Sequence, residues 1–172
     1  ERLKLVLLGS RDAPWDWNLV ENDLYYSPHW WGMLGYEFNE LSTGSNLWEK
    51  IVHPDDLPKV NQAFNEVIQG DSNTYEIEFR MRHKDGHYVP VLSRGFILRD
   101  VEGKPLRVSG TNSDLTERKQ MEAARLSALE LLQKVTNRIP GMVYQFRLRP
   151  DGSSHLPYVS EGIRDVYHVQ PE

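Results

Sequence analysis

The residues with the clearest potential for chemistry stand together in the segment His53-Pro54-Asp55-Asp56. A histidine beside two carboxylic acids could bind a metal ion, hold a haem iron or take part in general acid–base catalysis. The same segment also suits the start of a helix, because Pro is favoured in a first helical turn and acids there interact well with the helix dipole. We therefore predict that His53, Asp55 and Asp56 begin a helix and have no catalytic role.

Cysteine and histidine usage excludes most other site chemistry. The chain has six His and no Cys, which excludes disulfides, thiolate nucleophiles, thiolate metal sites and a flavin–cysteinyl adduct. No His pair has the spacing of a zinc motif such as H-E-x-x-H, so we predict no metal site. Walker, nucleophile-elbow, cyclase and kinase phosphoacceptor motifs are also missing from the sequence, and we do not expect an enzyme in these residues. The remaining histidines are expected at the surface: His29, His83, His87, His155 and His168.

The composition is that of an ordinary globular protein. Hydrophobic residues make up 39% and charged residues 26% of the 172 residues, and the net charge is −5. Without a basic stripe, this charge argues against nucleic-acid binding. The longest apolar run, residues 5–8, is too short to span a bilayer, so we expect no membrane contact within this segment and a cytoplasmic location. Because the chain begins with Glu1, we expect it to be a piece of a longer protein, which could itself be membrane-anchored.

Short strands and helices are predicted for the first part of the chain. Residues 1–12 read as an N-terminal helix or linker that ends at Gly9-Ser10. Alternating apolar and polar residues then predict short strands, and Ser27 before Pro28 predicts a capped helix start. The predicted elements are strands at 15–19 and 24–26, short helices at 28–34 and 47–52, and a longer amphipathic helix at 57–69.

The pattern then changes to the period of two that is typical of strands. Four apolar residues alternate with charged ones over residues 75–82. Asp85-Gly86 is a hairpin signal, and further strands are predicted at 88–99 and 106–113.

A long uninterrupted helix is predicted for residues 115–138, which contain no Gly or Pro. Its length of roughly 36 Å exceeds what a small domain needs for its own packing. Apolar residues recur at alternating spacings of three and four, as in a coiled-coil seam. The seam could pack on the domain's own sheet, but we expect it to pair two copies as a homodimer, because so long a stripe is difficult to bury within one small domain. The seam residues are Met121, Ala124, Ala128, Leu131 and Val135.

The opening pattern returns after the long helix. Tyr144-Gln145-Phe146-Arg147-Leu148 repeats the alternation of residues 15–19, and Pro157-Tyr158-Val159-Ser160 parallels residues 24–27. The period of about 130 residues is that of a whole domain. Residues 139–172 are therefore expected to begin a second, incomplete module.

Short motifs occur in a characteristic order between residues 13 and 119. The last of them, Asp114–Lys119, is the most specific. In order and spacing they resemble the PAS fold with its C-terminal PAC motif. The motifs are Trp15-Asp16-Trp17, Ser27-Pro28, Gly35-Tyr36, Trp48, His53-Pro54-Asp55-Asp56, Glu78-Phe79-Arg80, Asp85-Gly86, Ser93-Arg94-Gly95, Gly103-Lys104-Pro105, Gly110 and Asp114-Leu115-Thr116-Glu117-Arg118-Lys119.

The resemblance implies an α+β fold, with a five-stranded antiparallel sheet, short helices on one face and a long signalling helix after the sheet. It places the PAS domain with its PAC motif at residues 13–114, the signalling helix at 115–138 and the start of a second PAS domain at 139–172. Such modules resemble those of bacterial histidine kinases and cyclic-di-GMP enzymes. We therefore expect a covalently linked effector downstream.

The resemblance also implies a cavity between the sheet and the short helices. Small residues Ser93 and Gly110 would leave room in it, and Asn112 would offer a polar contact, although an aromatic-filled, ligand-free interior is an equal expectation. The ligand is unknown. The Asn-Cys-Arg-Phe signature of flavin-binding relatives is missing, and no His lies at 57–69, where haem-binding relatives carry their ligand. The candidate lining residues are Trp30, Leu47, Ile51, Phe64, Phe79, Met81, Ser93, Val108, Gly110 and Asn112.

The joint between the last strand and the long helix is the candidate relay. Asp114 and Glu117 have the spacing of a capping box, and Thr116 is an alternative cap. In the family such a joint is thought to couple the sheet to the helix. The resemblance thus suggests a sensory module that binds a small ligand or partner and relays its state to an effector. The alternative is a ligand-free PAS domain that serves for dimerisation and spacing.

Overall fold

The computed structural model describes residues 12–41, 47–70, 72–138, 141–160 and 162–163. The expected N-terminal helix at 1–12 lies outside these residues, except for Asp12. The chain divides into two compact units, Glu1–Arg118 and Lys119–Glu172, and each unit is described by itself.

A five-stranded antiparallel sheet forms the first unit, with the strand order β2-β1-β5-β4-β3. Along β2 and β3 buried residues alternate with exposed ones, so one face of the sheet contributes to the core. This five-stranded antiparallel sheet confirms the predicted fold class. The strands are β1 (Ala13–Asn18), β2 (Asp23–Tyr26), β3 (Thr74–Arg82), β4 (Tyr88–Arg99) and β5 (Pro105–Asp114).

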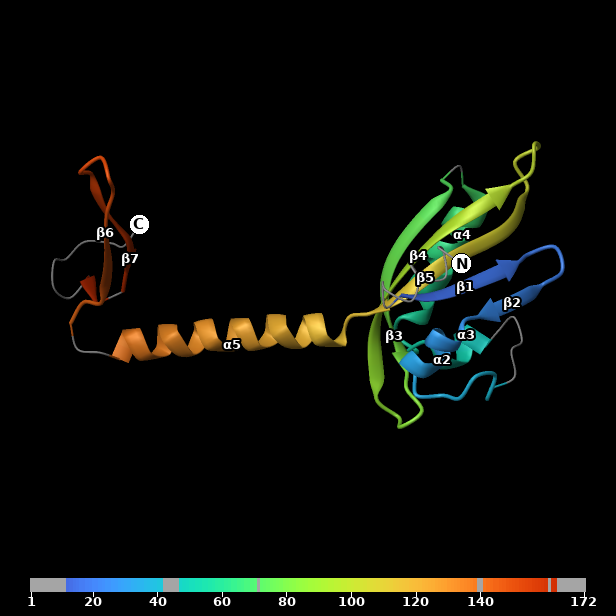
Figure 1. Cartoon of the computed structure of the whole chain (residues 1–172), viewed down its shortest axis with the longest axis horizontal. Coiled ribbons are helices and arrows are strands. Elements are labelled where there is room, and N and C mark those ends of the chain that lie inside the picture. The colour runs from blue at the N-terminus through green and yellow to red at the C-terminus, as the bar shows by residue number, and fades with distance from the viewer. Residues whose placement is uncertain (1–11, 42–46, 71, 139–140, 161, 164–172) are drawn as a thin grey trace. The chain divides into compact units, whose positions relative to one another are not determined.

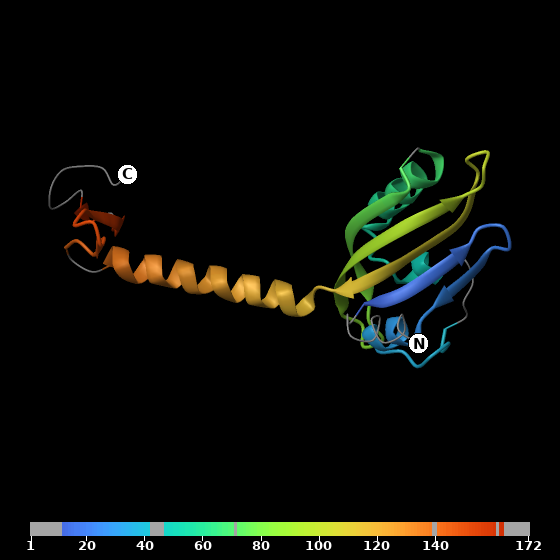
Figure 2. The same ribbon diagram turned by 45° about the horizontal axis from the view of Figure 1, so that its top comes forward.

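Three helices lie on the buried face of this sheet (Figures 1 and 2). They are α2 (Pro28–Met33), α3 (Leu47–Ile51) and α4 (Leu57–Gln69). The predicted cap of α2 is confirmed, because the Ser27 side chain accepts a hydrogen bond from the Trp30 N–H. The α2 segment ends before Gly35, whose φ of +76° is readily adopted only by glycine.

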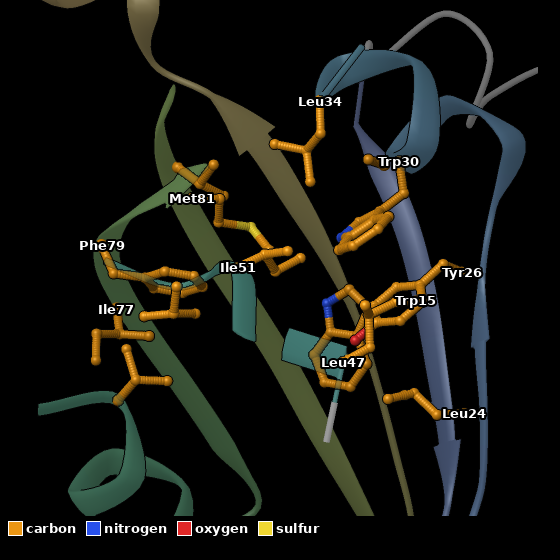
Figure 3. Packing of buried hydrophobic residues seen from close by; sticks show 14 of the residues in the cluster. Trp15, Leu24, Tyr26, Trp30, Leu34, Leu47, Ile51, Ile77, Phe79 and Met81 are labelled. Carbon is orange, nitrogen blue, oxygen red and sulfur yellow. The ribbon is translucent and has the colours of Figure 1, made fainter. Parts of the chain in front are cut away.

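The core between the helices and the sheet is rich in aromatic side chains. Trp30, Trp31 and Leu34 are completely buried. Tyr26 stacks on Trp30 with 3.8 Å between ring centroids, and Trp31 lies edge-on to Trp30 at 5.2 Å. Figure 3 shows Tyr26, Trp30 and Leu34 in one cluster with side chains of β3 and α3.

The second unit contains most of a long helix and a two-stranded hairpin. The helix is α5 (Thr116–Arg138), and the hairpin strands are β6 (Tyr144–Leu148) and β7 (Ser154–Val159). The strands pair antiparallel, with Tyr144 opposite Val159. Among the helices of the described ranges, none is both long and apolar enough to cross a membrane.

Candidate functional site

A row of paired residues crosses the middle of the five-stranded sheet and explains how the interior is filled. Tyr26 pairs with Trp15, Trp15 with Gly110, Gly110 with Gly95, and Gly95 with Tyr75. A Cβ at Gly110 would lie 2.8 Å from the Trp15 ring, and a Cβ at Gly95 would lie 2.2 Å from the Tyr75 ring. The two glycines therefore provide the space into which the neighbouring aromatic rings pack.

On the buried face of the sheet, this packing leaves a small cavity next to the row. Its volume is about 40 Å³, whereas pockets for drug-sized ligands and cofactors measure roughly 300–1,000 Å³. A volume of this size accommodates roughly three water molecules. The cavity is lined by Trp15, Trp17, Leu24, Tyr26, Trp30, Trp48, Val52, Val60, Phe64, Phe79, Met81, Ser93 and Asn112.

Buried polar groups at the sheet side of the cavity bond to one another. The Trp15 indole N–H donates to Oδ1 of Asn112 at 3.1 Å, and Nδ2 of Asn112 donates to the Met81 sulfur at 3.7 Å. The hydroxyl groups of Tyr75 and Ser93 lie 3.2 Å apart. Burial raises the pKa of both Tyr26 and Tyr75 far above the ordinary phenol value, so both hydroxyls remain protonated.

The helix side of the cavity presents a hydrogen-bond donor that lacks a partner. The Trp30 side chain is completely buried, and its Nε1 finds no acceptor among the residues that the structure describes. Figure 3 shows this nitrogen on the side of the ring that faces Met81. An unpaired buried donor costs about 1–3 kcal/mol, so an acceptor from a water molecule or a small solute would be favourable there.

The joint at the end of β5 links the sheet to α5. Asp114, the last residue of the strand, pairs with Val91 of β4. The next residue, Leu115, is buried and its N–H donates to the Pro90 carbonyl at 2.9 Å. The Asp114 carboxylate accepts from the Thr116 N–H at 2.7 Å. The backbone is thus held by hydrogen bonds on both sides of the point where the strand becomes a helix.

Comparison with known proteins decides the family. The family described as PAS fold matches residues 23–112, more than half of the chain. The chain belongs to the PAS-fold family. This PAS fold is a sensory and non-catalytic fold, so the chain is a PAS sensor domain of the kind that occurs in signalling proteins.

A solved structure and two curated relatives illustrate this membership. A sensory box histidine kinase/response regulator from Burkholderia thailandensis is 34% identical, with a TM-score of 0.63, and the match covers 78% of this chain and 99% of that one. The methyl sulfide methyltransferase-associated sensor of Methanosarcina acetivorans is 28% identical over 133 residues, which cover 77% of this chain. A probable diguanylate cyclase of Escherichia coli is 28% identical over 139 residues, or 80% of this chain. The chain spans only 13% and 12% of the length of these two curated proteins, so they are much larger multidomain proteins.

The structure places the residues of the predicted pocket in three kinds of position. Six line the cavity, whereas Leu47, Ile51 and Val108 are buried in the surrounding core. Gly110 does face the interior, but the Trp15 ring occupies the room that we expected it to leave. The six lining residues are Trp30, Phe64, Phe79, Met81, Ser93 and Asn112.

Several lining residues of the PAS cavity were missed by the sequence analysis, most notably Trp15 and Tyr26. Both alternate with polar residues in short strands, so a signal for burial was present. The alternation indicated that both residues are buried in the core. It could not indicate that they line the cavity, because the set of lining residues depends on which strands are neighbours in the sheet.

Two expectations about helix starts need correction. The Asp114 carboxylate accepts from the N–H of Thr116, two residues away. Thr116 is the first helical residue rather than the cap. Asp56 precedes α4 but makes no cap hydrogen bond. Its carboxylate instead binds the Arg80 side chain at 2.8 Å, so helix-terminus chemistry alone does not explain this acid.

The histidines also differ in part from the expected surface positions. His83 and His155 are half-buried, and His168 lies outside the described residues. The ring centroids of His53 and Tyr88 lie 4.4 Å apart, and Nδ1 of His53 accepts a hydrogen bond from the Asp55 N–H. His83, Asp85 and His87, which the sequence analysis did not connect, come together in the turn between β3 and β4.

Proposed function

We propose that this PAS domain is a signal-input module that passes the state of its interior to α5 through β5. The position of Asn112 carries the proposal. Asn112 lines the cavity, accepts the Trp15 N–H and lies two residues before Asp114, which holds the first amide of α5. Two residues of strand span roughly 7 Å. A displacement of Asn112 therefore reaches the helix start through one short, hydrogen-bonded piece of backbone.

The ligand that best fits this interior is a small polar solute with a hydrogen-bond acceptor. A partner protein that binds the outside of the domain is the other possible input. The Trp30 N–H, for which no described residue supplies an acceptor, is the donor that such a solute would meet. A cavity of about 40 Å³ does not suit a flavin or a haem. The ligand must bind one arrangement of the core better than another in order to change the output.

A matched pair of substitutions in β5 tests the relay. Asn112 faces the interior, whereas its neighbour Thr111, on the same strand, pairs with Arg94 of β4 and belongs to the opposite face. We expect Asn112→Ala to shift the amide NMR resonances of residues 116–121, and Thr111→Ala to leave them nearly unchanged. Equal shifts, or none in either variant, would refute the relay through β5.

A ligand-free dimerisation and spacing unit is the second candidate function. The small cavity supports it, and so does α5. The predicted seam is exposed along its length, with exposures of 62% for Met121, 62% for Leu131 and 51% for Val135. A second copy would bury this stripe. Native mass spectrometry discriminates the candidates, since a co-purified small molecule supports ligand sensing and an unliganded mass supports the spacing role.

The second unit is proposed as the start of another PAS domain. In the first unit, the Ser27 N–H donates to the Pro14 carbonyl, and the Ser27 carbonyl accepts from Trp30 three residues on. In the second unit, Ser160 pairs in the same way with Val143 and with Ile163. The hairpin side chains Phe146 and Leu148 are exposed, as expected for two strands that belong to a larger sheet. A series of such modules would connect this domain to a covalently linked effector.

A further inference from the structure

The turn between β3 and β4 brings together two imidazoles and a carboxylate. His83 and His87 face each other across the turn, with the His83 N–H donating to the His87 carbonyl at 2.8 Å. Their rings stack with 4.2 Å between centroids. Asp85 lies between them in sequence, and its Oδ2 is 3.5 Å from Nδ1 of His83. One ligand atom from each of the three residues lies within 4.8 Å of the other two.

His83 is the fixed member of this cluster. A Cβ at Gly35 would lie 2.3 Å from its Nε2, so that side of the ring is closely covered by the backbone. Its Nδ1 accepts from the Asp85 N–H at 3.1 Å and therefore has its lone pair directed into the turn. The side chain is only 18% exposed, which limits its rotation.

The other two ligands project from an exposed turn. The Asp85 side chain is 78% exposed, and His87 is exposed as well. Donor atoms around a tetrahedral zinc ion lie about 3.4 Å apart, given Zn–N distances near 2.1 Å. Rotation of the Asp85 and His87 side chains toward Nδ1 of His83 brings the three donor atoms closer together, while the Asp85 N–H has to turn away from Nδ1 to make room for the ion.

We propose that His83, Asp85 and His87 bind a divalent transition-metal ion of the zinc class. Imidazole nitrogen suits such ions, and one carboxylate oxygen completes a three-residue set that leaves a coordination position for water. Zinc binding at Nδ1 of His83 displaces the hydrogen bond that the Asp85 N–H donates there. This inference is independent of the cavity and of the relay through β5.

A metal ion at this turn restrains a part of the domain that touches α2. The Lys84 N–H donates to the Leu34 carbonyl at 2.9 Å, and Nζ of Lys84 lies 2.6 Å from the Glu40 carboxylate. Leu34 itself is completely buried beside the tryptophans of α2. Binding at the turn therefore stiffens the hairpin against the end of α2, on the helix side of the core.

Isothermal titration of the full 172-residue chain with zinc chloride tests the site, using protein without a polyhistidine tag. We expect saturable binding of one ion per chain. His87→Gln and Asp85→Asn should each weaken it by roughly tenfold or more, and His29→Gln, a histidine outside the cluster, should leave it unchanged. Magnesium, which prefers oxygen ligands, should give no comparable binding.

Two results would overturn the site. One is the absence of saturable zinc binding, and the other is an affinity that survives His87→Gln. Because His87 is exposed, its substitution does not threaten the fold, and circular dichroism of each variant checks this. A chemical-shift map of zinc binding gives a second reading, with the largest changes expected at residues 83–87 rather than at residues 53–56.

Discussion

Asp56 and Arg80 are 24 residues apart in the sequence, and their side chains form a two-pronged ion pair. Nε and Nη2 of Arg80 each donate to the Asp56 carboxylate at 2.8 Å, and the Arg80 backbone N–H donates to it as well. The hydrogen bonds from the Arg80 side chain are the main reason that the pKa of Asp56 falls to about 2. The pair fastens the start of α4 to β3.

This pair predicts a specific pH dependence of stability. The folded-state pKa lies below the unfolded value, so its contribution is complete above about pH 4 and is lost as the pH falls toward 2. At pH 7 we expect Asp56→Asn to lower the free energy of unfolding by about 1–2 kcal/mol, reduced by the partial exposure of Arg80. The difference from wild type should shrink between pH 4 and pH 2. Urea unfolding at several pH values measures both effects.

Asp55→Asn is the matched control for this experiment. Asp55 adjoins Asp56 but is 78% exposed and lies 3.8 Å from the Arg80 guanidinium. Its substitution should change stability by less than about 1 kcal/mol. A pH-independent difference for Asp56→Asn, or an equal loss for both variants, would contradict the role assigned to the ion pair.

Among the elements, β5 carries the clearest constraint from packing. Gly110 lies between Trp15 and Gly95, and an added Cβ would come within 2.3 Å of the Arg94 carbonyl oxygen. Overpacking of this kind costs about 1–3 kcal/mol or more. We expect Gly110→Ala to lower the free energy of unfolding by at least about 1 kcal/mol, as measured by urea denaturation.

Gly32 supplies the control for this prediction. It lies inside α2, and an added Cβ would meet nothing within 4 Å. Because Ala favours a helix over Gly by up to about 1 kcal/mol, Gly32→Ala should be neutral or stabilising. A neutral Gly110→Ala would show that the glycine row does not limit the packing of the interior.

Element types and order could be predicted from the sequence because they depend on local signals. The alternation over residues 75–82 predicts β3, Ser27-Pro28 predicts the start of α2, and Asp85-Gly86 predicts the hairpin. Arg99 makes contacts that local sequence signals do not predict. Its guanidinium donates to carbonyls of Val67, Ile68 and Gly70 at the end of α4. No local pattern connects residues about 30 positions apart, so this interaction was not foreseen.

The candidate site was predicted less completely for the same reason. Ser93 and Asn112 were identified as polar residues on inward-facing strands, and both line the cavity. The size of the cavity depends on how the Trp15 and Tyr75 rings fill the glycine row, which follows from strand pairing. His83 and His87 were treated as separate surface residues, because only the turn geometry brings their rings together.

At the scale of the whole molecule, the dimer is the first property to test. In the predicted seam Leu131 faces the second copy, whereas Leu126 lies on the opposite side of the helix. Both are exposed in the single chain, at 62% and 57%, so neither substitution should affect folding. We expect Leu131→Glu to convert the dimer into a monomer by light scattering, while Leu126→Glu should remain dimeric. A monomeric wild-type chain, or a dimer in both variants, would refute the seam.

The central claim is that the interior controls the arrangement of α5 in the dimer. The chain contains no Cys, so Ala123→Cys provides a single spin-label position on the exposed helix, away from the seam. Pulsed electron paramagnetic resonance then measures the distance between the labels of two copies. We expect Asn112→Ala to change this distance distribution and Thr111→Ala to preserve it. Identical distributions in wild type and Asn112→Ala, with the dimer intact, would contradict the account.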